Sequence, residues 1–149
     1  MQPRYFEDFQ AGQEFSLGPH TVTRAEIIAF AAEFDPQPFH LDEQAAASTL
    51  LGGLAASGWH TCALFMRMLY DGWLIGTASM GSPGVDQLKW KRPVRPGDVL
   101  SGRSVVIECR ASRSRTDRGF VRCRHEIVNG CGETVMTCDN PIIVARRAA

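Results

Sequence analysis

The run from Trp59 to roughly Ile75 predicts one long helix that is apolar around nearly its whole circumference. Its only charged residues, Arg67 and Asp71, lie one turn apart. A helix with so little polar surface has to be buried on nearly every side. This requirement constrains the fold more than any other part of the chain, because other elements must wrap around the helix.

The rest of the chain supplies elements that meet this requirement. We expect a short strand at 15–22, a helix that a Thr23–Glu26 capping box starts and Asp35 ends, and a short helix at 43–47 capped by Asp42. After the long helix we expect strands at 87–91, 99–109, 120–128 and 135–144, with a turn at 93–98, a hairpin turn at Asn129-Gly130, and an edge position or bulge at Pro141.

This order of elements predicts an α+β fold, in which a curved antiparallel β-sheet wraps around the long central α-helix. One such layer leaves the far face of the helix and one edge of the sheet uncovered. We therefore expect a homodimer or a higher homo-oligomer that joins two sheets edge to edge.

Composition narrows the class of protein. The 149 residues suit a single domain, residues 1–149, with one core. Sixteen basic residues balance sixteen acidic ones, so no global field attracts nucleic acid. The first residues lack the apolar core of a signal peptide, and no apolar run approaches the ~20 residues of a membrane span. We expect a cytoplasmic protein with no membrane partner.

The cysteines indicate neither a metal site nor a redox site. There are five of them, at 62, 109, 123, 131 and 138, and no two form a C-x-x-C pair. A zinc site or a dithiol is therefore not expected, and free thiols in a reducing cytosol are the natural interpretation.

An aspartate and a histidine, Asp35 and His40, are the first candidate for chemistry. Their offset of five residues would turn them apart by about 140° on a helix and onto opposite faces of a strand. Pro36 and Pro38 instead fix an irregular bend that can aim both side chains at one point. A carboxylate and an imidazole placed so can hold and activate one water molecule. The same residues also suit a helix end at Asp35 and an ordinary loop histidine at 40.

A second candidate lies at the start of the long helix. Ser57 is a credible N-cap, and the free amides of Gly58 and Trp59 carry the positive end of the helix dipole. Glycine lets a ligand oxygen approach the backbone closely, so the Gly58 amide can stabilise an oxyanion formed at a thioester carbonyl. A plain tight turn leading into a core helix is the alternative.

Three motifs in this order resemble the MaoC-like dehydratase family, the (R)-specific enoyl-CoA hydratases with the hotdog fold. In the family's hydratase motif an aspartate is followed typically by Asn-Pro, then by a histidine five positions after the aspartate, and then by an acidic residue; Asp35, Pro38, His40 and Asp42 match it here. Gln37 stands where asparagine is usual. Residues 53–61 are similar to the family's start of its central helix, and residues 88–98 to its strand–turn–strand signature. The resemblance spans roughly residues 5–145.

The resemblance implies a hotdog fold and a reversible syn hydration of a trans-2-enoyl thioester to an (R)-3-hydroxyacyl thioester. By this similarity Asp35 and His40 are the catalytic pair, and the Gly58 amide polarises the thioester carbonyl. Ser57, Trp59 and Gln37 complete the expected substrate-binding residues. The substrate would be an acyl-CoA or an acyl-carrier thioester, and no metal or redox cofactor is implied.

Two other functions remain open on this scaffold. One is a hotdog thioesterase, in which an aspartate directs water at the carbonyl. The other is a non-catalytic acyl-thioester binding protein, which the change to Gln37 keeps possible. Two basic clusters are candidates for meeting a phosphorylated carrier, although a solvated hairpin tip explains the first as well: Arg110, Arg113, Arg115 and Arg118 in one polar loop, and Lys91 with Arg92.

Overall fold

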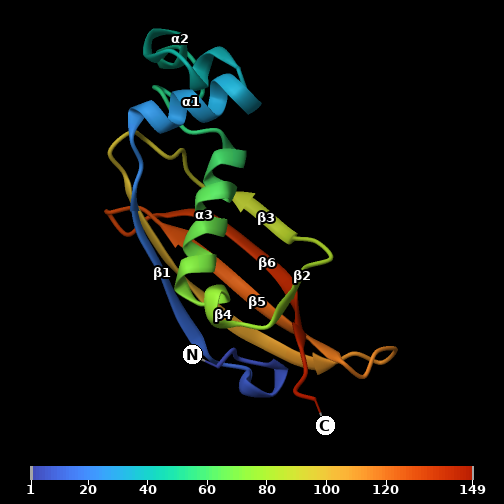
Figure 1. Cartoon of the computed structure of the whole chain (residues 1–149). Coiled ribbons are helices and arrows are strands. Elements are labelled where there is room, and N and C mark those ends of the chain that lie inside the picture. The colour runs from blue at the N-terminus through green and yellow to red at the C-terminus, as the bar shows by residue number, and fades with distance from the viewer. Residues whose placement is uncertain (1, 149) are drawn as a thin grey trace.

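The computed structural model describes residues 2–148, in which one antiparallel sheet of six strands carries the long helix α3 across one of its faces (Figure 1). The strands run in the order β1-β4-β5-β6-β2, and β3 also pairs with β6. The strands are β1 (Glu14–Thr21), β2 (Ser79–Gly81), β3 (Asp86–Trp90), β4 (Val99–Ala111), β5 (Arg118–Val128) and β6 (Thr134–Ala145). The predicted α+β arrangement of a sheet around a central helix is confirmed.

The helices lie at one end of the sheet or across it. They are α1 (Arg24–Phe34), α2 (Glu43–Ala47) and α3 (Gly58–Gly72), with short 3-10 helices at Phe6–Asp8, Pro38–His40 and Leu74–Gly76. Figure 1 shows α1 and α2 together beyond the N-terminal end of α3. None of the helices in residues 2–148 combines the length and the apolar character needed to cross a membrane.

Helix α3 is buried on one side only. Its sheet-facing residues, among them Phe65, Met68 and Leu69, are at most 8% exposed, whereas Trp59 is 61% exposed. The prediction of a helix buried on nearly every side is therefore wrong for the single chain, because one sheet covers one face. The helix also ends at Gly72, before the predicted Ile75, and Trp73 turns into the core.

One strand and one hairpin turn differ from expectation. Strand β2 was not predicted, because its three residues are exposed and carry no alternation. The β5–β6 hairpin forms at Asn129, but its loop is longer than Asn129-Gly130, and Gly132 takes the positive φ of 78°. Pro141 lies in β6 opposite Arg122 of β5, and on the other side of β6 it falls between the pairings with β3 and β2. On that side of β6 no strand pairs with Pro141, so the missing N–H of proline breaks no hydrogen bond between strands.

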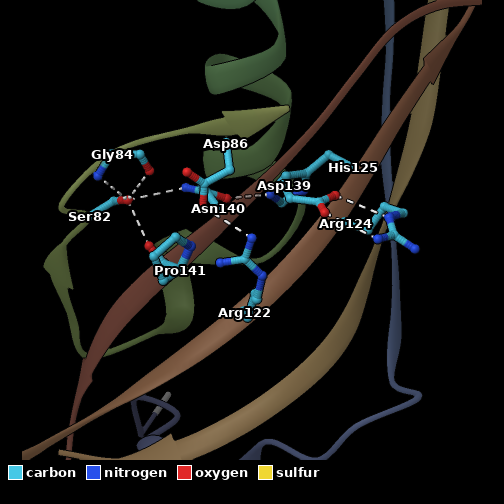
Figure 2. Close-up of polar contacts among 9 residues, drawn as sticks. All are labelled: Ser82, Gly84, Asp86, Arg122, Arg124, His125, Asp139, Asn140 and Pro141. Carbon is cyan, nitrogen blue, oxygen red and sulfur yellow. Dashed lines mark hydrogen bonds and ion pairs between the residues drawn. The ribbon is translucent and has the colours of Figure 1, made fainter. Parts of the chain in front are cut away.

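A row of hydrogen-bonded polar side chains crosses the sheet at His125, which is fully buried on β5. Its Nε2 lies 2.6 Å from Asn140 Oδ1, an acceptor, and its Nδ1 lies 2.8 Å from the Ser104 hydroxyl. The neutral Nε2–H tautomer satisfies both contacts. Figure 2 shows this row of hydrogen bonds continuing through Asn140 to Ser82, whose hydroxyl donates to the Pro141 carbonyl. The network fixes the loop between β2 and β3.

Candidate active site

The end of α1 places Asp35 and His40 on opposite sides of a tight bend. Thr23 caps α1 by accepting from the Glu26 amide, and the helix stops at Phe34, since Pro36 restricts Asp35 to φ −149°. The predicted capping box forms only in half, because the Glu26 carboxylate turns to His20 instead, 2.9 Å from its Nε2. Pro38 then opens a 3-10 turn that ends at His40.

The bend brings the two side chains into contact. His40 Nε2 lies 3.3 Å from Asp35 Oδ2, and the two side chains are 9% and 16% exposed. On its other side His40 Nδ1 lies 2.7 Å from the Ala55 carbonyl oxygen. A carbonyl can only accept, so Nδ1 carries a hydrogen and donates it. The Nε2 atom is thereby turned toward the carboxylate.

Two donors hold the Asp35 carboxylate ionised. The Ser57 hydroxyl donates to Oδ2 at 2.7 Å, and the Gln37 side-chain amide donates to Oδ1 at 2.7 Å. The Ser57 hydrogen bond is the main cause of a lowered Asp35 pKa, with Gln37 and His40 contributing in the same direction against partial burial. Hydrogen bonds to a charged form favour that form.

Ser57 performs two tasks with one hydroxyl group. Its oxygen accepts from the Trp59 amide at 3.3 Å, as expected of the N-cap of α3, and its hydrogen goes to Asp35. The residue is fully buried. Sequence reasoning found the cap but missed the bond to Asp35, 22 positions away. The available signal was that a capping hydroxyl keeps a hydrogen free to donate.

Gly58 begins α3 and is covered closely by an aromatic ring. A Cβ built on it would lie 2.5 Å from Trp90 Cε2, so only glycine fits beneath the indole. The Gly58 amide finds no protein acceptor within residues 2–148 and belongs to the unpaired first turn of the helix. A close approach was predicted here for a ligand; the structure shows that Trp90 makes one.

His40 and Gly58 line the same cavity, which has a volume of about 510 Å³. Its wall is mostly apolar and comes from the α2–α3 connection and the β3–β4 connection. The lining residues are Phe39, His40, Thr49, Leu50, Leu51, Ala55, Ala56, Gly58, Thr61, Trp90, Lys91, Arg92, Pro93 and Val94. A preformed apolar pocket with few polar groups is the usual form of a small-molecule site.

Three of the predicted residues lie behind or beside this cavity. Asp35 contacts His40, which lines the cavity, and Ser57 directly precedes Gly58, which also lines it. Gln37 is exposed and donates to the Asp35 carboxylate. Trp59 does not line the cavity; its ring packs edge-on against Trp90 at 5.3 Å between centroids. Trp90 and Pro93 form part of the cavity wall, whereas the sequence predicted only a strand and a turn at these positions.

The two basic clusters lie at different places. Lys91 and Arg92 line the cavity, and Arg92 also pairs with Glu133 at 3.0 Å. The arginines of the 110–118 loop belong to the β4–β5 hairpin, which Figure 1 shows at the far end of the sheet from α1 and α2. Of the two clusters, Lys91 with Arg92 is the one positioned to meet a ligand in this cavity.

His60 is buried away from the cavity. Its ring stacks on Phe30 at 4.7 Å, its Nε2 lies 3.9 Å from Glu26, and its Nδ1 has no partner in the described chain. Burial lowers the His60 pKa against the attraction of Glu26. Within residues 2–148 no three histidine, cysteine or acidic side chains are arranged to hold a metal ion.

Comparisons with known proteins show the family to which this chain belongs. The family model described as MaoC like domain matches residues 8–126. A solved MaoC-like dehydratase from Rhodospirillum rubrum is 44% identical, with a TM-score of 0.91 over 98% of this chain and 99% of its own. An (R)-specific enoyl-CoA hydratase of Rhodospirillum rubrum is 33% identical over 106 residues, 68% of this chain and 69% of its own.

A further likeness shows the fold. A protein from Mycobacterium tuberculosis with a double hotdog fold is 19% identical, with a TM-score of 0.81 over 97% of this chain and 45% of its own. The curved antiparallel sheet with its central helix is therefore a hotdog fold, as the resemblance implied.

Proposed function

The chain belongs to the MaoC-like family, and we propose that it is a hydratase/dehydratase of acyl thioesters. In the proposed reaction water adds reversibly and syn to a trans-2-enoyl-CoA, giving an (R)-3-hydroxyacyl-CoA. The observation that carries the proposal is the 3.3 Å contact of His40 Nε2 with Asp35 Oδ2 at a cavity that Gly58 also lines. A hydratase relative, 33% identical, supports the same class of reaction.

Asp35 and His40 activate the water. Two atoms 3.3 Å apart leave room for one oxygen within hydrogen-bond reach of both. Because His40 Nδ1 donates to Ala55, Nε2 is the ring nitrogen left to meet this water, and the Asp35 carboxylate accepts a hydrogen from the same water. The water oxygen then attacks C3 of the enoyl group while the Asp35/His40 pair takes up its proton, and the pair delivers a proton to C2. The reverse sequence removes water.

The Gly58 amide is the proposed donor to the thioester oxygen. Attack at C3 moves negative charge onto that oxygen as an enolate, and an amide at a helix N-terminus stabilises it in place. The amide has no protein partner among residues 2–148, which supports this role. The reaction moves only water and a proton, so it needs no metal or redox cofactor.

The remaining cavity residues suit an acyl thioester. Apolar walls at Leu51, Ala56 and Val94 accept an acyl chain, while Lys91 and Arg92 suit the phosphates of coenzyme A or of a carrier-bound arm. Ser57, Gln37 and Trp59 act indirectly in this proposal. Ser57 and Gln37 orient Asp35, and Trp59 supports the Trp90 ring.

A homodimer is proposed as the working form, in the cytoplasm. The exposed side of α3 carries Trp59, Met66 and Tyr70, which are 61%, 49% and 45% exposed, and such a patch favours a partner surface. All five cysteines are free, which suits a reducing compartment. Size-exclusion chromatography with light scattering tests the dimer, and a monomer at micromolar concentration would contradict it.

One assay separates the three candidate functions. Purified protein is mixed with crotonyl-CoA, and the absorbance of the conjugated enoyl thioester is followed together with the release of free thiol. Loss of conjugation without thiol supports the hydratase, and thiol release supports the thioesterase. If longer and branched enoyl thioesters also give neither signal, the non-catalytic binding protein remains.

A further inference from the structure

The segment that leads into α3 is buried but has no regular secondary structure. Leu54, Ala55, Ala56 and Ser57 are at most 7% exposed, and no helix or strand includes them. This segment holds both catalytic side chains in place, since the Ala55 carbonyl accepts from His40 and the Ser57 hydroxyl donates to Asp35. Its own position therefore has to be fixed by other parts of the molecule.

Arg95 donates several of the hydrogen bonds that fix this segment. Its Nη1 donates to the Gly53 carbonyl at 2.8 Å and to the Leu54 carbonyl at 3.3 Å, and its Nη2 donates to the Leu51 carbonyl. From the other side the Glu43 carboxylate accepts from the Leu54 amide at 3.1 Å. Arginine suits this task because its planar fork presents several donors at fixed angles.

Arg95 is itself held by a rigid turn. Its amide donates to the Asp98 carboxylate at 2.8 Å, the Asp98 amide returns to the Arg95 carbonyl, and Gly97 takes a φ of 86°. One residue earlier, the Val94 carbonyl accepts from the Ala56 amide at 2.9 Å. The turn that the sequence showed at 93–98 thus reaches across to the segment before α3.

We propose that Arg95 is a positioning residue for His40. It fixes the carbonyls of Leu51, Gly53 and Leu54, and so holds the adjoining Ala55 carbonyl where it keeps the hydrogen of His40 on Nδ1. The inference deepens the proposed function and rests on it for its kinetic part. Its structural part, the tautomer of His40, does not depend on which reaction the protein catalyses.

A purely structural arginine would behave differently. Its loss would lower the melting temperature while leaving the folded fraction with a normal His40 and a normal kcat. A positioning arginine changes the geometry of the folded protein, and a misplacement of 1 Å at a catalytic group can lower kcat by about 100-fold. Because Arg95 does not itself line the substrate cavity, KM should change less than kcat.

The test compares Arg95→Ala and Arg95→Lys with the matched control Arg146→Ala, whose guanidinium pairs with Glu7 at 3.0 Å, away from both the cavity and α3. Nitrogen-15 NMR of the histidine side chains reports the His40 tautomer, assigned by the signal lost in His40→Ala. Crotonyl-CoA turnover gives kcat and KM. Lysine keeps the charge but not the fork, so Arg95→Lys should lose kcat nearly as far as Arg95→Ala.

Chemical rescue adds a readout that stability alone does not move. The Arg95 side chain lies along an open hollow bordered by Arg24, Glu43 and Pro96, so free guanidinium can enter the vacant slot in Arg95→Ala. At millimolar concentrations, far below those that unfold proteins, guanidinium should restore the Nδ1–H signal and part of kcat. The control variant should show neither loss nor rescue.

The outcomes separate the two proposals. A wild-type His40 signal in folded Arg95→Lys or Arg95→Ala overturns the positioning role, whatever the activity. If Arg95→Ala does not fold, Arg95→Lys alone decides. A disturbed His40 signal in a protein that hydrates no enoyl thioester supports the positioning role and rejects only the hydratase.

Discussion

The Ser57 hydroxyl joins the start of α3 to the carboxylate of Asp35, accepting from the Trp59 amide at 3.3 Å while donating to Asp35 Oδ2 at 2.7 Å. One oxygen therefore links the folding of the central helix to the charge state of the proposed base. Its hydrogen bond is also the main reason that the Asp35 pKa lies below its usual value.

Ser57→Ala should raise the Asp35 pKa. The pKa of this carboxyl is lowered in the wild type, so the ionised form of Asp35 that the proposed mechanism uses is lost only when the pH falls below that lowered value. Without the Ser57 donor, the acidic limb of the kcat/KM profile should move to higher pH. Loss of the cap should also cost about 1 kcal/mol of stability. Ser57→Thr keeps a hydroxyl and serves as the control; an acidic limb that stays in place in Ser57→Ala would contradict the assignment.

Asp35→Asn and His40→Ala should each lower kcat/KM for crotonyl-CoA by about 1,000-fold, since each removes one half of the proton transfer. Little change in melting temperature is expected, because His40 lines the cavity, Asp35 lies beside it, and neither belongs to the hydrophobic core. Calorimetry of each variant checks the fold. Full activity in either one removes that residue from the mechanism.

Gly58→Ala should damage both stability and turnover. The new methyl group would overlap the Trp90 ring, and overpacking of this kind costs about 1–3 kcal/mol. Trp90→Ala removes the obstacle, so the double variant should be more stable than the sum of the two single effects predicts. A double-mutant cycle by urea unfolding measures the coupling. Simple additivity would mean that Trp90 does not restrict position 58.

His125 should make the protein less stable in mild acid. Burial lowers the pKa of His125 in the folded state, against a smaller opposing effect of Asn140. The unfolded chain therefore binds the proton more readily, and stability should fall as the pH drops below about 6.5, the ordinary value of histidine. The slope for one such group reaches about 1.4 kcal/mol per pH unit.

Two variants separate this contribution from that of His60, whose pKa burial also lowers. His125→Gln should flatten the dependence of urea-unfolding free energy on pH between 7.5 and 5. His60→Phe, which keeps a ring stacked on Phe30, should remove only the part due to His60. A slope in His125→Gln equal to that of the wild type would show that His125 does not titrate on unfolding.

Local sequence signals predicted the elements that local physics controls. Thr23, Asp42 and Ser57 cap their helices as expected. The prolines at 36 and 38 indicated the bend that brings Asp35 and His40 together. In each case the residue acts on backbone no more than a few positions away.

What escaped prediction depends on contacts between distant segments. The bond from Ser57 to Asp35, the Trp90 ring over Gly58 and the Arg95 contacts all join residues more than twenty positions apart. No periodicity records such a meeting. Strand β2 escaped for a different reason, because three exposed residues carry too little pattern.

The partner of His40 Nδ1 is a main-chain oxygen, and this limits what genetics can reveal about the site. No replacement at position 55 deletes a peptide carbonyl, so a saturation scan would score Ala55, which is 1% exposed, by side-chain size alone. A contact that orients the imidazole would leave no trace in such a scan. Spectroscopy of the ring itself, or synthesis that alters the backbone, is what can reach it.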